Sequence, residues 1–237
     1  MNRDINKINH LGVIMDGNRR WAAKKNLPLL EGYKTGVKIA EQTVELVILN
    51  KIPNLTLYTI SADNLKRPQE QVQYIFNLLE NYLLKDKHIL KDKNVRLQVV
   101  GDKKSLPNSL QDAIRIAEEE SQNNTHLNLY LAVNYGGRQE ILDACKKMLT
   151  NEIKEDQINL ENFSKYLYAP QMPNLDYVIR TGDSERISDF LLWKISYAEL
   201  CFLKVLWPDI TKRHIKAAIE NFQNRPRTFG TNSACKI

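Results

Sequence analysis

Residues 16–20, Asp16-Gly-Asn-Arg-Arg20, combine side chains that bind metal ions and phosphates, and they follow a short apolar run, residues 11–15. An aspartate at the end of a buried strand can hold a divalent cation, and the glycine after it lets the backbone approach a ligand closely. A helix with Asn18 as its capping residue would direct free backbone N–H groups at an anion, and the arginines add paired phosphate donors. These residues predict a metal-assisted diphosphate site. The simpler alternative is an ordinary strand-to-helix turn with surface charges.

Polar residues also follow the other apolar runs at their carboxyl ends. They include Asn64 and Arg67, the sequence Asn134-Tyr-Gly-Gly-Arg138, and Arg180. Each of these segments alone could be a turn, because glycine, asparagine and aspartate favour turns. In an open parallel sheet, however, ligands bind beyond the carboxyl ends of the strands. We therefore predict that Asp16, Asn64, Arg67 and Arg180 share one rim of the sheet.

Six short apolar segments alternate with longer segments of helical periodicity. This alternation predicts a mainly parallel sheet with helices on both faces, an α/β fold. The expected strands are residues 11–15, 55–61, 95–100, 127–133, 177–180 and 203–206, and the expected helices include residues 37–49, 72–90, 110–120 and 140–149. No linker divides the chain, so residues 1–237 are expected to form one domain, with a mobile tail at 231–237.

The composition narrows the class of ligand. Of the 237 residues, 43% are hydrophobic and 26% charged, and the net charge of +6 suits an anionic ligand, an acidic membrane surface or nucleic acid. The three cysteines lack metal or disulfide spacing, which indicates a reducing cytoplasm. The sequence contains neither a GxxxxGK[ST] phosphate loop nor a GxGxxG fingerprint, so it does not support nucleotide binding by either of these common motifs.

Two of the expected helices are broadly apolar. In one, Val72, Ile75, Phe76, Leu79 and Leu83 recur at helical spacing. Core packing explains most stripes of this kind. A helix this apolar is also suited to line a tunnel for a hydrocarbon ligand.

Taken together and in this order, the motifs resemble those of the cis-prenyltransferase family, of the undecaprenyl diphosphate synthase type. The likeness rests on residues 10–21, 56–68, 134–138, 176–182, 186–193, 197–199 and 206–209. It implies a six-stranded, mostly parallel sheet flanked by helices, with an apolar tunnel. It also implies a magnesium-dependent, homodimeric enzyme that adds isopentenyl diphosphate to an allylic diphosphate in cis geometry.

The resemblance also implies roles for particular residues. Asp16 matches the catalytic acid that handles Mg²⁺ and the allylic diphosphate, and Glu199 matches a second metal-linked carboxylate. Asn64 matches a catalytic position, which we interpret as an orienting hydrogen-bond group, because a neutral amide is a very weak base. The residues implied in substrate binding are Gly17, Asn18, Arg19, Arg20, Trp21, Ser61, Asp63, Arg67, Arg180, Arg186 and Ser188.

Several residues near the diphosphate sites depart from the pattern of this family. They are Leu29, Tyr33, Leu65, Gln71, Ser184 and Thr228. Leu29, in place of an arginine, cannot contact phosphate, whereas Tyr33, in place of a histidine, can still donate one hydrogen bond. Because the main carboxylates and arginines remain, we expect activity, with primer affinity more affected than the reaction.

The favoured function is synthesis of a long polyprenyl diphosphate, by default undecaprenyl diphosphate made from farnesyl diphosphate for cell-wall carrier lipid. The alternative is a non-catalytic partner subunit of a prenyltransferase complex, against which the presence of Asp16 and Glu199 argues. Only the charge suggests nucleic-acid binding, and the sequence lacks the aromatic interleaving of a stacking surface. Since the product is too apolar for water, we expect a cytoplasmic homodimer that contacts the inner face of the membrane.

Overall fold

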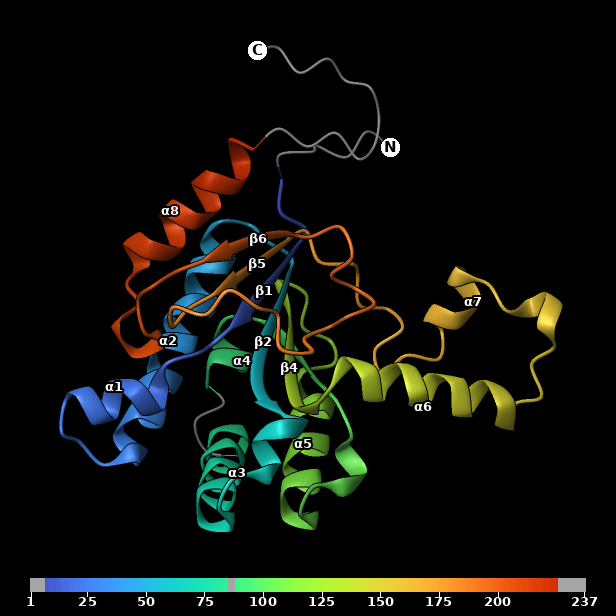
Figure 1. The fold of residues 1–237 in the computed structure, drawn as a ribbon, viewed down its shortest axis with the longest axis horizontal. Coiled ribbons are helices and arrows are strands. Elements are labelled where there is room, and N and C mark those ends of the chain that lie inside the picture. The colour runs from blue at the N-terminus through green and yellow to red at the C-terminus, as the bar shows by residue number, and fades with distance from the viewer. Residues whose placement is uncertain (1–6, 85–87, 226–237) are drawn as a thin grey trace.

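A six-stranded sheet forms the centre of the computed structural model, which describes residues 7–84 and 88–225 (Figure 1). The strands are β1 (His10–Ile14), β2 (Asn54–Ser61), β3 (Val95–Val100), β4 (Leu127–Tyr135), β5 (Tyr177–Arg180) and β6 (Glu199–Phe202). Their order is β3-β4-β2-β1-β5-β6, and each neighbouring pair is parallel. The predicted parallel sheet is confirmed, and the first strand of the chain lies in its interior.

Helices cover mainly one face of the sheet. The helices are α1 (Asn18–Lys24), α2 (Leu29–Leu49), α3 (Gln69–Leu84), α4 (His88–Asp92), α5 (Asn108–Ser121), α6 (Gly137–Thr150), α7 (Leu160–Ser164) and α8 (Lys212–Gln223). Residues of α2, α3, α5 and α8 share one core with one side of the strands. The opposite face packs on the mostly irregular chain between α7 and β6, including Phe190 and Leu191. Figure 1 shows α6 and α7 extending away from the sheet.

Successive strand residues belong to opposite faces, as a pleated strand requires. In β1, Val13 joins the core under α2 and α3, whereas Ile14 joins the core under Phe190. His10 is buried at the start of β1, where its ring nitrogens bond to the Pro173 carbonyl and to Thr56 Oγ1, each at 2.8 Å. Burial lowers the pKa of His10 to about 4, so the ring is neutral and its role is structural.

Four features of the elements differ from the sequence expectation, and the first is that α2 begins at Leu29, eight residues before the expected start at residue 37. The last strand is Glu199–Phe202 instead of residues 203–206, because residues 200–206 are apolar except for Lys204 and only the first part of this segment pairs with β5. The helix expected at 72–90 is met by α3, which ends at Leu84, and by the separate α4. Gly17, with φ of 122°, occupies the cap position that we expected for Asn18. The tail at 231–237 lies outside the described residues.

Within residues 7–84 and 88–225, no helix combines the length and the apolar character needed to cross a lipid bilayer.

Candidate active site

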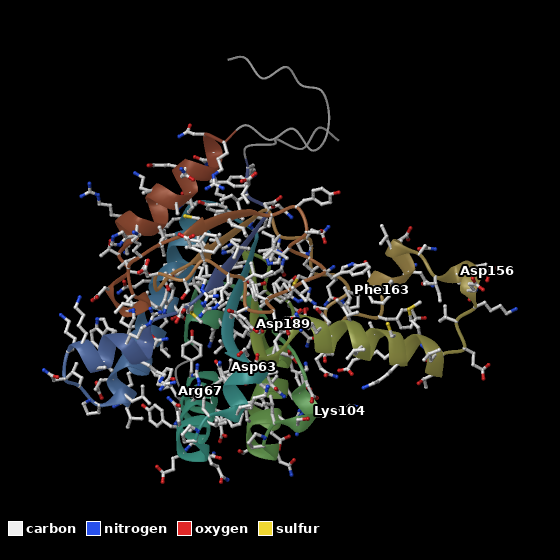
Figure 2. The ribbon with its side chains drawn as sticks, viewed as in Figure 1. Asp63, Arg67, Lys104, Asp156, Phe163 and Asp189 are labelled. Atoms are coloured by element: carbon white, nitrogen blue, oxygen red, sulfur yellow. The ribbon has the colours of Figure 1, made fainter. Side chains whose placement is uncertain are left out.

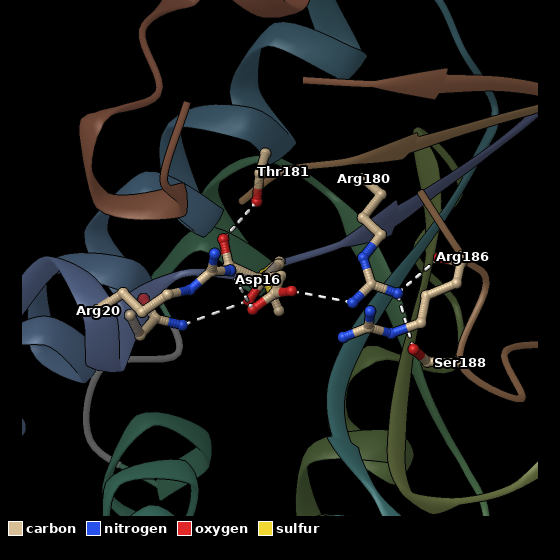
Figure 3. A network of polar contacts seen from close by, with 8 residues as sticks. Asp16, Arg20, Arg180, Thr181, Arg186 and Ser188 are labelled. Carbon is tan, nitrogen blue, oxygen red and sulfur yellow. Dashed lines mark hydrogen bonds and ion pairs between the residues drawn. The ribbon is translucent and has the colours of Figure 1, made fainter. Parts of the chain in front are cut away.

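Asp16 lies just beyond the carboxyl end of β1, between two arginines (Figure 3). Its Oδ2 accepts a hydrogen bond from Arg180 Nη2 at 2.9 Å, and its Oδ1 lies 3.1 Å from Arg20 Nη2. The Asp16 side chain is 30% exposed, whereas that of Arg180 is 5% exposed. The carboxylate is therefore fixed by two cations and still open to a ligand.

The topology of the sheet explains this meeting. Strands β1 and β5 are parallel neighbours, with Ile14 opposite Arg180, so their carboxyl ends coincide. The turns that follow pass close together, and Thr181 Oγ1 donates to the Asp16 carbonyl at 2.7 Å. A Cβ on Gly182 would lie 2.6 Å from Arg20 Nη2, and its φ of 87° also favours glycine. The local sequence is thus adapted to bring the two strand ends into contact.

Arg180 connects Asp16 to the loop that follows β5. Its Nη1 donates to Ser188 Oγ at 2.7 Å and to the Arg186 carbonyl at 2.5 Å (Figure 3). Its Nε has no acceptor among the described residues, although it is buried. A guanidinium held on several sides is preorganised and does not lose much freedom when a phosphate binds. The guanidinium of Arg186, which is exposed, faces the same cavity.

Residues 61–67 form the opposite wall of the site. Ser61 caps a short 3₁₀ helix, Ala62–Lys66, by accepting a hydrogen bond from the Asn64 amide at 3.2 Å. Asp63 pairs with Lys66 at 2.7 Å, and Figure 2 places Asp63 and Arg67 next to α3. These contacts order the loop internally and leave Asn64 on the cavity wall.

Tyr33 and Gln71, which depart from the pattern of the resembled family, together hold this loop. The hydroxyl of Tyr33 on α2 accepts hydrogen bonds from Arg67 Nη1 at 3.1 Å and from Gln71 Nε2 at 3.2 Å. Burial raises the pKa of Tyr33, so the hydroxyl remains neutral. Of the other departing residues, Leu29 lines the cavity and Leu65 packs against the main core, while Thr228 lies outside the described residues.

A cavity of about 760 Å³ joins these walls. Its charged lining consists of five arginines and two aspartates, a net charge of +3. Because α1 has only seven residues, the arginines supply most of the positive charge. The predicted site residues that line it are Asp16, Gly17, Asn18, Arg19, Arg20, Ser61, Asp63, Asn64, Arg67, Arg180, Arg186 and Ser188. The cavity therefore suits a multiply charged anion, as predicted.

The structure does not bring Trp21 and Glu199 into this cavity. The indole Nε1 of Trp21 donates to Asp209 Oδ1 at 2.7 Å. Glu199 begins β6 opposite Tyr177, which in turn lies opposite Leu11. Glu199 is therefore displaced from Asp16 by five residues along the strands, about 16 Å. Its carboxylate instead accepts a hydrogen bond from Arg225 at 2.8 Å, so one chain does not pair the two predicted metal ligands.

An apolar cavity of about 110 Å³ adjoins the charged one between α2, α3 and the sheet. Its lining includes Val37, Val44, Leu79, Leu131 and Trp207, all apolar or aromatic. Both cavities are lined by Met15, Asn18, Tyr33, Thr59 and Ile75. The stripes on the two broadly apolar helices thus serve the core and also border a space beside the anion site.

Tyr58 is a cavity-lining residue that the sequence did not reveal. It lies on β2, its ring stacks on Phe190 at 4.8 Å, and its hydroxyl donates to the Ser188 carbonyl at 3.2 Å. A tyrosine in an apolar strand is typical of a core residue. The one sequence feature that could have indicated its place at the cavity is its position three residues before Ser61.

The carboxylate of Asp16 fits one mode in which proteins bind Mg²⁺. Among the described residues, no group of three or more histidine, cysteine, aspartate or glutamate side chains could hold a metal ion. Mg²⁺ commonly binds through one or two carboxylates together with substrate phosphates and water. The partly exposed Asp16 fits that mode, since each carboxylate oxygen has a second lone pair beyond its arginine contact.

Comparison with known proteins gives likenesses over nearly the whole chain. The profile of the family described as putative undecaprenyl diphosphate synthase matches residues 14–230. The isoprenyl transferase of Rickettsia typhi is 44% identical over 224 residues, covering 94% of this chain and 98% of that protein. The isoprenyl transferase of Thermotoga maritima is 39% identical, with 93% and 96% covered.

Two solved structures share the fold. One is lavandulyl diphosphate synthase from Lavandula x intermedia in complex with dimethylallyl diphosphate, with a TM-score of 0.91 and 31% identity; the match covers 96% of this chain and 100% of that chain. The other is a probable undecaprenyl diphosphate synthase from Campylobacter jejuni, with a TM-score of 0.80 and 35% identity over 94% of this chain and 99% of that one. These matches extend across Asp16, Arg20, Arg180 and Arg186 in sequence and fold.

Proposed function

Because the chain belongs to the undecaprenyl diphosphate synthase family and is a cis-prenyltransferase, we propose that it condenses isopentenyl diphosphate with farnesyl diphosphate to give a long polyprenyl diphosphate. The product that we propose is undecaprenyl diphosphate, for cell-wall carrier lipid. One observation carries the proposal. The Asp16 carboxylate is held by Arg20 and Arg180 on the wall of a charged cavity that adjoins an apolar one.

We propose that the allylic diphosphate binds beside Asp16. Arg19 and Arg20 supply charge, and Gly17 allows the turn from β1 into α1, because its φ is 122° and a Cβ there would lie 3.0 Å from Leu206. Its hydrocarbon chain would lie in the adjoining apolar cavity, beyond Met15. Departure of the diphosphate builds negative charge on phosphate oxygens, which preorganised arginines stabilise.

Mg²⁺ would be held by Asp16 together with oxygens of the diphosphate. When bound, the ion neutralises charge on the leaving diphosphate. Glu199, which pairs with Arg225, has no part in this proposed site within one chain.

We assign the diphosphate of isopentenyl diphosphate to Arg180, Arg186 and Ser188, which meet at the other side of Asp16. The allylic cation must meet the isopentenyl double bond before water does, so the loop at 61–67 would close over the cavity. Asn64 would orient the reacting groups while a diphosphate oxygen accepts the proton. Asn64→Asp should keep more turnover than Asn64→Ala; a strong new pH dependence in Asn64→Asp would contradict this role.

We also propose that residues 1–237 are one catalytic domain that forms a homodimer in the cytoplasm. Exposed apolar side chains on and beside α6 and α7 support an interface there: Leu142 is 55%, Leu149 77% and Leu160 76% exposed.

Near the charged cavity, exposed Leu27 and Leu30 lie close in sequence to Lys24 and Lys25, a combination that suits an anionic bilayer surface. Analytical ultracentrifugation and flotation with anionic vesicles test these two statements; a monomer or no co-flotation would refute them.

The proposed reaction is tested by incubating the protein with farnesyl diphosphate, labelled isopentenyl diphosphate and Mg²⁺, and by measuring product length. Elongation by the protein alone supports the proposal. Elongation only after a second protein is added would instead favour the non-catalytic partner subunit. Products that stop after a few additions would be consistent with cis-prenyltransferase activity but would refute undecaprenyl diphosphate as the product.

A further inference from the structure

The motif Asn134-Tyr-Gly-Gly-Arg138 is not explained by the proposed reaction. Among the described residues, neither Gly136 nor Gly137 lines the charged cavity. Both lie at the start of α6, against the loop that carries Arg186 and Ser188.

The loop has an unfavourable backbone conformation. Ser188, Asp189 and Leu191 have φ values of 51°, 63° and 42°, in the left-handed region that non-glycine residues rarely adopt. Such residues persist only where their surroundings hold them. Three of them within four positions indicate that the loop is fixed by contacts from outside itself.

Arg180 and Tyr58 contact this loop from the sheet, and Asp189 attaches it to the N-terminus of α6. Its backbone carbonyl accepts a hydrogen bond from the Gly137 amide at 2.8 Å, and its Oδ1 accepts one from the Arg138 amide at 3.1 Å. Figure 2 shows Asp189 beside the beginning of this helix. The first amides of a helix lack partners within it and carry partial positive charge, so a carboxylate is a favourable acceptor.

The two glycines leave the space that this contact requires. A Cβ on Gly136 would lie 2.9 Å from Asp189 Oδ2. A Cβ on Gly137 would lie 2.9 Å from the Asp189 carbonyl oxygen and 2.6 Å from Leu192 Cγ. Side chains at either position would push the loop away from α6.

The position of Asp189 sets the position of the residue before it. Ser188 Oγ accepts a hydrogen bond from Arg180 Nη1 at 2.7 Å, and Arg180 binds Asp16 through Nη2. We propose that Asp189, seated on the Gly136-Gly137 turn, is a positioning residue for the isopentenyl diphosphate site, because it holds Ser188 and Arg180 in their binding geometry. This inference rests on the proposed function and adds a group that does not itself touch the substrate.

The test compares Asp189→Ala with Asp183→Ala. Asp183 is exposed, lies in the same loop and also has a left-handed φ, 58°, so the two substitutions cost the backbone similarly. In the full chain, Asp189→Ala should raise the KM for isopentenyl diphosphate about tenfold, the usual worth of one charge-assisted hydrogen bond. The KM for farnesyl diphosphate and the Asp183→Ala kinetics should remain near those of the unmodified protein.

Two further variants separate positioning from folding. Asp189→Gly removes the carboxylate but relieves the left-handed strain, so it should fold and still raise the same KM. Asp189→Asn keeps an acceptor oxygen and should restore most of the affinity. Hydrogen exchange of the Gly137 and Arg138 amides should be faster in Asp189→Gly than in the unmodified protein.

The outcomes distinguish this inference from the proposed function. If the unmodified protein does not elongate farnesyl diphosphate, the proposed function fails. If it does, and Asp189→Gly has an unchanged KM for isopentenyl diphosphate, the positioning role is wrong. A lower melting temperature with unchanged KM in the Asp189 variants would leave Asp189 a purely structural residue and would also overturn the inference.

Discussion

Replacing Asp16 by asparagine removes one negative charge from a cavity lined by five arginines and two aspartates, while the shape of the side chain hardly changes. Arg180 Nη2 keeps an acceptor at this position, but the hydrogen bond is no longer between opposite charges. We expect the free energy of unfolding to fall by about 1–2 kcal/mol. The cost stays below the 3–5 kcal/mol typical of a broken buried pair because Asp16 is 30% exposed.

The same change should affect binding and turnover in opposite directions. Without metal, the net charge of the cavity lining rises from +3 to +4, so inorganic pyrophosphate should bind roughly fivefold more tightly. With Mg²⁺, the unmodified protein should gain affinity for pyrophosphate, and Asp16→Asn should not. Turnover should fall by about 10³-fold or more, because the charge balance at the leaving group is lost.

Calorimetric titration of pyrophosphate in EDTA and in Mg²⁺, combined with incorporation of labelled isopentenyl diphosphate, measures these quantities. Asp112→Asn is the matched control, because it removes the same charge from an exposed site on α5. Full turnover in Asp16→Asn would refute the reasoning. So would an equal gain in pyrophosphate affinity on adding Mg²⁺ to both proteins.

Three further predictions concern the walls and the core. Tyr33→Phe removes the acceptor shared by Arg67 and Gln71, so hydrogen exchange in residues 61–67 should accelerate. The lost hydrogen bonds are worth about 1 kcal/mol, so the KM for substrate should rise several-fold in steady-state kinetics. The fold lowers the pKa of His10 to about 4, below the 6.5 of an unfolded chain. Between these two values the unfolded chain binds a proton at His10 and the folded protein does not, so the free energy of unfolding decreases as the pH falls from 6.5 toward 4. The loss should be about 2 kcal/mol at pH 5 in urea unfolding, and His10→Gln should flatten this dependence; an unchanged slope would contradict it. Val37→Trp fills the apolar cavity and should shorten the products seen by chromatography; products of unchanged length would place the growing chain elsewhere.

The rim of the sheet was predictable from sequence because parallel strands place their carboxyl ends together. Asp16 and Arg180 each come at the end of an apolar run, which is enough to expect them on one rim, whereas their direct contact depends on β1 and β5 being neighbours. The anionic ligand followed from the arginines around them. By contrast, residues 200–206 are apolar except for Lys204, so the sequence did not show which part of this segment pairs with β5 as the edge strand β6.

Side-chain partners that are remote in sequence were not predictable in this way. Trp21 and Glu199 match functional positions of the family by residue type, but in the structure Trp21 donates a hydrogen bond to Asp209 and Glu199 accepts one from Arg225. Tyr33 departs from the family pattern and still helps to hold the loop. Residue type indicates what a side chain can do, whereas the fold decides which partner reaches it first.

The interior position of β1 has a consequence for synthesis of the protein. Asp16 and Arg180 are separated by 164 positions in the chain, and β5 is made long after β1. During translation, the nascent chain therefore exposes one edge of β1 until more than three quarters of the protein has left the ribosome. Contacts of such high sequence separation form slowly, and an unpaired edge can join another chain. A chain interrupted before residue 180 lacks the buried arginine that binds Asp16 and leaves one edge of β1 unpaired.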